Sequence, residues 1–108
     1  MTVINCAVYM LTRKIVIGEG MDAVKEVANR YGAGYYSPWK KYLKKQNLQM
    51  KLKRNERWIK DEIKKGSEFL DIGIDPQKRE RSQFYKMEKR VIREKKYQKI
   101  KPIKRPVL

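Results

Sequence analysis

Apolar runs of strand length alternate along the chain with segments whose apolar residues recur at helical spacing. Residues 3–10 and 14–17 are rich in apolar and β-branched residues, which predicts two strands or one interrupted strand. Residues 69–74 form another apolar run and predict a buried strand. Asp75 and Pro76 follow it, and proline ends a strand because it has no N–H for the next ladder bond. Strands and helices in this order indicate an α/β fold.

Two helices have recognisable ends. Apolar residues lie on one face of residues 21–31, and Gly32 follows as a residue that commonly ends a helix. Ser82 is a good N-cap for the last helix, which has Met87 and Val91 on its apolar stripe. Both segments therefore predict helices that pack one face against a core.

Two further helices are expected in the middle of the chain. Ser37 and Pro38 suit the N-cap and first position of a helix over residues 38–45. Asn55 is a candidate N-cap for a helix over residues 55–65. With the strands, these segments predict a small central sheet flanked by about four helices.

The length of 108 residues suits one domain with a single modest core. We expect this α/β domain to cover residues 1–98. Residues 99–108 are basic and contain proline, so we expect them to form a tail outside the domain. No apolar run reaches about 18 residues, and no membrane span is predicted.

The charge of the chain indicates what kind of partner it binds. The net charge is +16, and nearly all of the excess lies after residue 37. Such a distribution favours contact with nucleic acid, DNA or RNA, or with another polyanion, whereas a lysine-rich surface that only aids solubility is the alternative. The basic and aromatic stretch in the middle of the chain supplies the candidates for phosphate contact, Lys40, Lys41, Lys44, Lys45, Arg54 and Arg57.

Histidine is absent and Cys6 is the only cysteine. These counts argue against a zinc or haem site and against a ribonuclease with paired histidines. Mg²⁺ prefers oxygen ligands and remains compatible with the composition. A catalytic site in this chain would use carboxylates, tyrosine, serine, lysine and arginine.

Asp71 and Asp75 are the leading candidates for a catalytic or metal-binding pair. They are four residues apart on one strand face, roughly 13 Å apart at full extension, so a turn at Gly73 would have to bring them together. They could then bind a divalent cation, or one could act as a base while the other orients it. In the structural alternative, Asp71 ends the strand and Asp75 forms an Asx turn before Pro76.

Other polar residues could complete such a site. Arg79 and Arg81 precede the last helix, and arginine suits phosphate recognition, although one of them could form a structural ion pair. Tyr85 and Glu88 share a face of that helix, where Glu88 could take part in catalysis and Tyr85 could be an acid or a core residue.

The segment of Gly18, Glu19 and Gly20 precedes a helix N-terminus, which favours anions. As a phosphate-binding turn it lacks the third glycine of a dinucleotide motif. Glu19 could assist catalysis, or it could favour the positive end of the helix.

Five short motifs follow one another along the chain, namely Lys14 to Met21, Asn55 to Ile59, Phe69 to Asp75, Arg79, and Phe84 to Glu88. Their order resembles that of the C-terminal toxin modules of Rhs-type bacterial polymorphic toxins. The resemblance covers about residues 14–90 and departs at Ile74, where related modules tend to have proline. It implies an effector delivered from another cell, acting in the cytoplasm of the recipient and matched by an immunity protein.

These observations together favour a toxin-like effector that acts on nucleic acid, most simply as a nuclease. Asp71 and Asp75 would be its centre, with Arg79 and Arg81 on phosphate and Glu19 or Glu88 assisting. The alternatives are an enzyme that acts on a nucleotide or NAD and a basic nucleic-acid-binding protein without catalysis.

Overall fold

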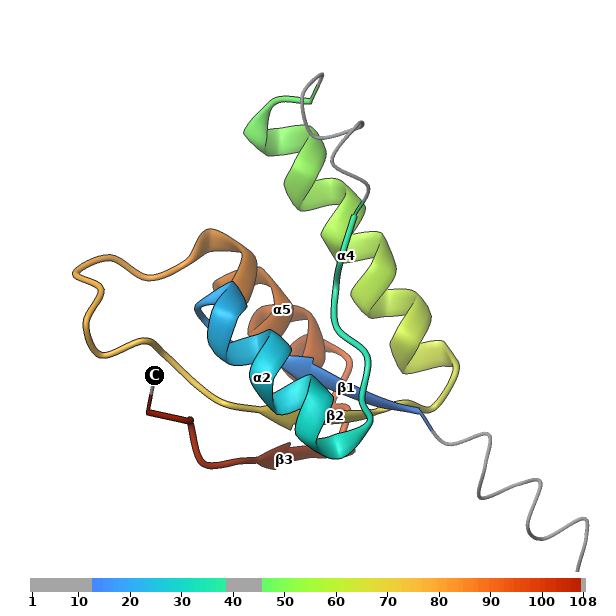
Figure 1. Cartoon of the computed structure of the whole chain (residues 1–108). Coiled ribbons are helices and arrows are strands. Elements are labelled where there is room, and N and C mark those ends of the chain that lie inside the picture. The colour runs from blue at the N-terminus through green and yellow to red at the C-terminus, as the bar shows by residue number, and fades with distance from the viewer. Residues whose placement is uncertain (1–12, 39–45, 108) are drawn as a thin grey trace, which may run out of the picture.

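Three short parallel strands form the centre of the protein in a computed structural model that describes residues 13–38 and 46–107 (Figure 1). They are β1 (Lys14–Ile17), β2 (Glu68–Asp71) and β3 (Ile100–Pro102), in the spatial order β1-β2-β3. Ile17 pairs with Asp71, and Asp71 pairs with Pro102, so the three strands end together at one edge of the sheet.

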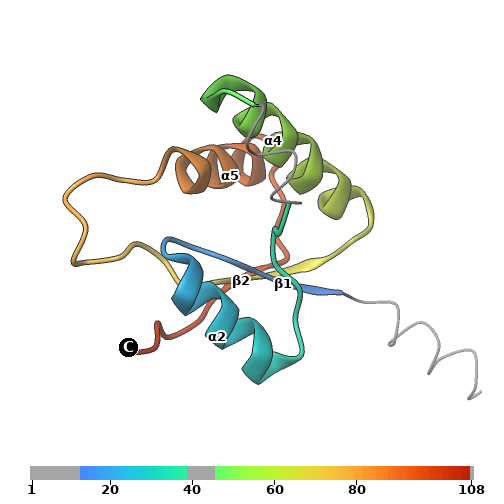
Figure 2. The ribbon, with the colours of Figure 1, turned by 45° about the horizontal axis from the view of Figure 1, so that its top comes forward.

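Helices cover both faces of this sheet (Figure 2). α2 (Met21–Tyr31) lies on one face, and α4 (Leu48–Lys64) and α5 (Gln83–Glu94) lie together on the other. Helices of a parallel sheet run back across it, so their N-terminal halves gather near the carboxyl ends of the strands. The predicted α/β class is thereby confirmed.

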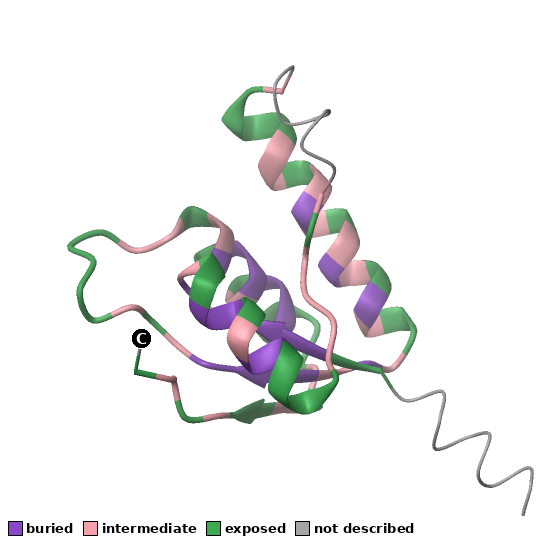
Figure 3. Cartoon of the chain, in the orientation of Figure 1, coloured by how far each residue is buried: buried purple, intermediate pink, exposed green. Residues whose placement is uncertain are grey.

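Side chains alternate between the two layers of the core, as the pleat of a strand requires. Ile15, Ile17 and Phe69 pack against α4 and α5, with Ile59 and Val91 among their partners. Val16 and Leu70 point the other way and pack against Val24, Val27 and Ala28 of α2. Figure 3 shows this buried centre, with exposed residues toward the free end of α4.

α4 begins earlier than the sequence predicted. Asn47, not Asn55, is its N-cap, and the Asn47 side chain accepts the Met50 N–H at 2.9 Å. The apolar stripe of the helix already includes Leu52, so the helical period continues through residues 48–54, for which no helix was predicted. Asn55 is thus buried inside the helix.

The predicted strand over residues 69–74 is also shorter, because the chain turns after Asp71. The Asp71 carboxylate accepts the Gly73 N–H at 2.9 Å, and Gly73 has a positive φ of 77°. Beyond this turn Ile74 is half exposed. Gly73 therefore does make the predicted turn.

The sheet includes part of the expected tail. β3 lies within residues 99–108, and the Phe69 N–H donates to the Lys99 carbonyl at 2.8 Å. Residues beyond the boundary expected at residue 98 therefore belong to the sheet and not to a separate tail. Ile100 was not recognised as a strand residue because its neighbours are lysines on an exposed edge.

The remaining elements follow the local signals. Gly32 ends α2 in the left-handed conformation, and Ser82 caps α5 by accepting the Tyr85 N–H at 3.3 Å. The described residues contain three helices rather than about four. The strand expected at residues 3–10 and nearly all of the helix expected at 38–45 lie outside the described residues. Within the described residues, no helix is both long and apolar enough to cross a membrane.

Candidate functional site

A cavity of about 550 Å³ opens at the carboxyl end of β1. Its wall is built from the N-terminal halves of the three helices together with Tyr36, Ser37 and Pro38. Ligands of open α/β sheets bind at this place, outside the carboxyl ends of the strands. The N-terminal ends of α2 and α5, at Gly20 and Ser82, also lie on this wall, and the positive end of a helix dipole favours an anion.

Glu88 lies on the wall of this cavity and is only 6% exposed. Burial raises the pKa of Glu88 to about 7, the negative charge of Asp71 adds to the rise, and a hydrogen bond from Asn55 opposes it. A carboxyl group with such a pKa exchanges its proton near neutral pH. Among the predicted catalytic residues, Glu88 therefore has the environment of an acid–base group.

Asn55 is, with Glu88, a buried polar residue on the wall of this cavity and is 2% exposed. Its side-chain oxygen is buried and has no hydrogen-bond partner. Buried acceptors without a donor are rare, since losing water without replacement costs about 1–3 kcal/mol. Asn55 was predicted only as a helix cap, yet its place on the apolar stripe of α4, four residues before buried Ile59, was a sequence signal for a polar residue facing inward.

Aromatic and basic residues complete the cavity. Tyr36, Phe84 and Tyr85 supply flat rings, and Lys25, Lys51 and Lys78 supply positive charge from α2, α4 and the loop after β2. Sequence reasoning missed Tyr36 and these lysines as site residues, because they come together only through the packing of distant segments.

Tyr85 is held in place by Asp71. The Tyr85 hydroxyl donates to the Asp71 carboxylate, with oxygen distances of 2.8 and 3.0 Å, and Lys89 Nζ lies 2.7 Å from the same carboxylate. Burial raises the pKa of the Tyr85 hydroxyl, and the hydrogen bond to Asp71 raises it further. Tyr85 is thus a neutral hydrogen-bond donor, and Asp71 is a positioning residue.

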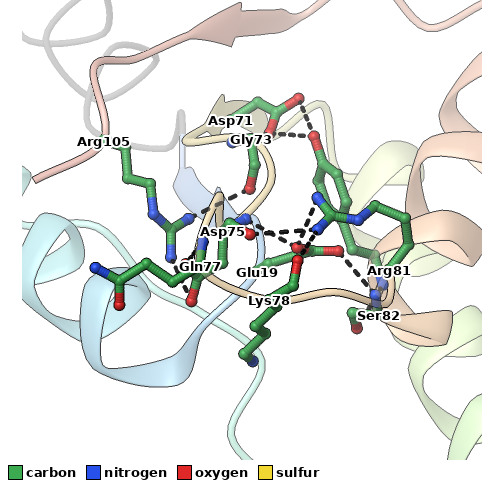
Figure 4. A network of polar contacts seen from close by, with 10 residues as sticks. Glu19, Asp71, Gly73, Asp75, Gln77, Lys78, Arg81, Ser82 and Arg105 are labelled. Carbon is green, nitrogen blue, oxygen red and sulfur yellow. Dashed lines mark hydrogen bonds and ion pairs between the residues drawn. The ribbon is translucent and has the colours of Figure 1, made fainter.

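Asp75 has different partners (Figure 4). One of its carboxylate oxygens accepts the Gln77 N–H at 3.0 Å, which is the Asx turn of the structural alternative, and the other lies 3.5 Å from Arg105. Asp71 and Asp75 share no partner among these contacts. The described residues include no group of three acidic or cysteine side chains suited to a metal ion, and Mg²⁺ at Asp71 and Asp75 stays a prediction.

Glu19 ties the turn after β1 to the loop after β2. Its carboxylate is buried, accepts the Asp75 N–H at 2.8 Å and the Ser82 N–H at 2.7 Å, and lies 3.3 Å from Arg81 (Figure 4). Burial acts to raise the pKa of Glu19, but the two backbone donors and the charge of Arg81 outweigh it and lower the pKa. Glu19 is therefore held ionised as a structural anchor.

Gly18 explains how Glu19 reaches this position. Gly18 has a φ of 149°, and a Cβ at this residue would lie 2.3 Å from Ile72. The two chain segments therefore approach closely only because residue 18 has no side chain. Gly20 also has a positive φ and lies on the cavity wall.

The predicted arginines separate into two groups. Arg81 binds the loop itself, donating to the Lys78 carbonyl at 2.7 Å beside its ion pair with Glu19. Arg79 and Arg57 are exposed. Burial raises the pKa of the Tyr36 hydroxyl on the cavity wall, and the charges of Arg54 and Arg57 oppose this rise. The predicted phosphate contacts at Lys40, Lys41, Lys44 and Lys45 lie outside the described residues.

A second cavity, of about 570 Å³, lies beside the first near the N-terminus of α2. Its wall includes Asp75 and Arg105, which already neutralise each other. The cavity of Glu88 is the better candidate site, because its carboxyl group can change charge at neutral pH and its Asn55 oxygen lacks a donor.

Fold and site together define a small parallel α/β protein with a basic, carboxyl-bearing cavity. Comparisons give no matching family model, no matching curated protein and no matching solved structure. The resemblance to Rhs-type toxin modules stays a prediction.

Proposed function

We propose that this protein is a toxin-like effector domain that cleaves nucleic acid, with Glu88 as its general base. The observation that carries the proposal is the buried Glu88 carboxyl, with a pKa raised to about 7, on the wall of a cavity with a basic rim. A base with a pKa near the working pH gives the most effective proton transfer.

The surroundings of Glu88 suit a nucleotide unit. Lys25, Lys51 and Lys78, with the N-terminal ends of α2 and α5, favour the phosphate. Tyr36 and Phe84 offer rings on which a base can stack, a contact worth about 1–3 kcal/mol. Asp71 contributes by fixing Tyr85 at the same wall.

In the proposed reaction, ionised Glu88 takes a proton from the attacking hydroxyl, which belongs to water or to the ribose of RNA. The attacking oxygen forms a bond to phosphorus as the bond from phosphorus to the leaving oxygen breaks. The leaving oxygen takes a proton, which Glu88 can return. The lysines offset the charge that develops on the phosphate oxygens.

The setting of this activity follows from the resemblance to polymorphic toxin modules. The domain would act in the cytoplasm of a recipient cell and be neutralised by an immunity protein. Growth arrest on expression, relieved by a small neighbouring gene product, would support this setting independently of the chemistry.

The test compares wild type, Glu88→Gln and Glu94→Gln on RNA, DNA and NAD, with Mg²⁺ or with chelator. Glu94 is on the same helix with an exposed side chain, so its variant is the matched control. We expect wild type and the control to cleave nucleic acid, and Glu88→Gln to be about 100-fold slower or worse.

Two other outcomes would identify the competing functions. Salt-sensitive binding of nucleic acid without cleavage would contradict the proposal and favour a binding protein. Consumption of NAD alone would favour an enzyme that acts on a nucleotide, a function that the size of the cavity also suits.

A further inference from the structure

The proposed cleavage gives no role to the buried side-chain oxygen of Asn55. Asn55 lies on the cavity wall beside Glu88, to which its amide donates a hydrogen bond. The amide oxygen remains without a donor. A ligand in the cavity can supply that donor.

The other walls limit the kind of ligand. The cavity volume of about 550 Å³ is in the range of about 300–1,000 Å³ for small-molecule sites. Aromatic residues favour a flat ring system, and Lys25, Lys51 and Lys78 favour an anion. A flat ring with an anionic group attached describes a nucleotide.

We propose that this cavity recognises a nucleotide whose base carries an exocyclic amino group, which donates a hydrogen bond to the Asn55 side-chain oxygen. Adenine, guanine and cytosine carry such a group and uracil does not. The inference rests on the proposed function for the choice of the cavity, and it adds the base preference and the residue that determines it.

Asn55 is a specificity residue in this arrangement, and Glu88 next to it keeps its role toward the phosphodiester. The Asn55 oxygen accounts for the rejection of a base without an amino group. A base without the amino group would fill the cavity and still leave the Asn55 oxygen buried without a donor, and sites built in this way discriminate strongly.

The test uses titration calorimetry at low salt with the full chain and mononucleotides, which contain no phosphodiester bond to cleave. The central pair is AMP and purine riboside 5′-monophosphate, which differ only by the amino group. We expect AMP to bind at least about tenfold more tightly. Equal affinities would overturn the inference, as would AMP, GMP and CMP all binding no better than ribose 5-phosphate.

The variant Asn55→Leu removes the acceptor at similar size. It is expected to abolish the preference for AMP over the analogue; an unchanged preference for AMP would contradict the role of Asn55. The wild-type pair decides the matter even if this variant fails to fold. Base preference without any cleavage would refute the proposed nuclease function but not this inference. Cleavage without base preference would refute this inference but not the nuclease function.

Discussion

Glu88→Gln is expected to be more stable than wild type at pH 8, by about 3 kcal/mol, and to differ by less than about 1 kcal/mol at pH 5. Burial raises the pKa of Glu88 from 4.5 to about 7. The folded state therefore binds the proton more tightly than the unfolded state. Wild-type stability falls as pH rises from about 4.5 to about 7. Above that pH the destabilisation by ionised Glu88 stays constant.

Urea unfolding at pH 5, 6, 7 and 8 measures this effect. Glu94→Gln on the same helix is the control and should follow the pH dependence of wild type. Glu88→Gln should lose the decline between pH 5 and 7. Parallel curves for wild type and Glu88→Gln would show that Glu88 does not have the raised pKa on which its role as a base depends.

Glu19→Gln is expected to destabilise the protein by about 3–5 kcal/mol, a large part of the roughly 5–15 kcal/mol that stabilises a domain. The two Glu19 oxygens accept from different N–H groups, of Asp75 and Ser82. An amide at residue 19 would set its own N–H₂ against one of these donors and leave Arg81 without its buried counter-charge.

The pH dependence of this effect is opposite to that of Glu88. The pKa of Glu19 is lowered in the folded state, so its stabilisation is present above its ordinary pKa of 4.5 and is lost as pH falls below that value. Urea unfolding between pH 3 and 7 should show this loss in wild type and not in Glu19→Gln. Glu26→Gln, at a surface ion pair with Arg30, should change stability by less than about 1 kcal/mol. If Glu19→Gln were equally mild, Glu19 would not be the anchor of the loop.

Local signals were sufficient for much of the fold. The strand at residues 14–17, the end of α2 at Gly32 and the cap of α5 at Ser82 depend on near neighbours, and each was predicted correctly. β3 was missed because its strand character comes from pairing with β2, 31 residues earlier at Phe69 and Ile100, and not from its own composition.

The candidate site was harder to predict from the sequence, because it too depends on contacts between distant segments. Asp71 ends β2, as in the structural alternative, but its hydrogen bond to Tyr85 depends on how α5 packs. The proximity of Asn55 and Glu88 depends on the packing of α4 against α5, and no local pattern encodes it. Glu19 was weighed as a catalytic assistant because burial by the loop after β2 could not be seen in the segment itself.

The pH dependence of the single-turnover cleavage rate tests the central claim most directly. On the nucleic acid that wild type cleaves, the rate is predicted to rise with pH and to level off above an apparent pKa of about 7, the pKa of Glu88. Glu88→Gln should be slower by about 100-fold or more and lack this rise. A Glu88→Gln variant with the rate and pH profile of wild type, or a wild type that cleaves no nucleic acid, would contradict the account.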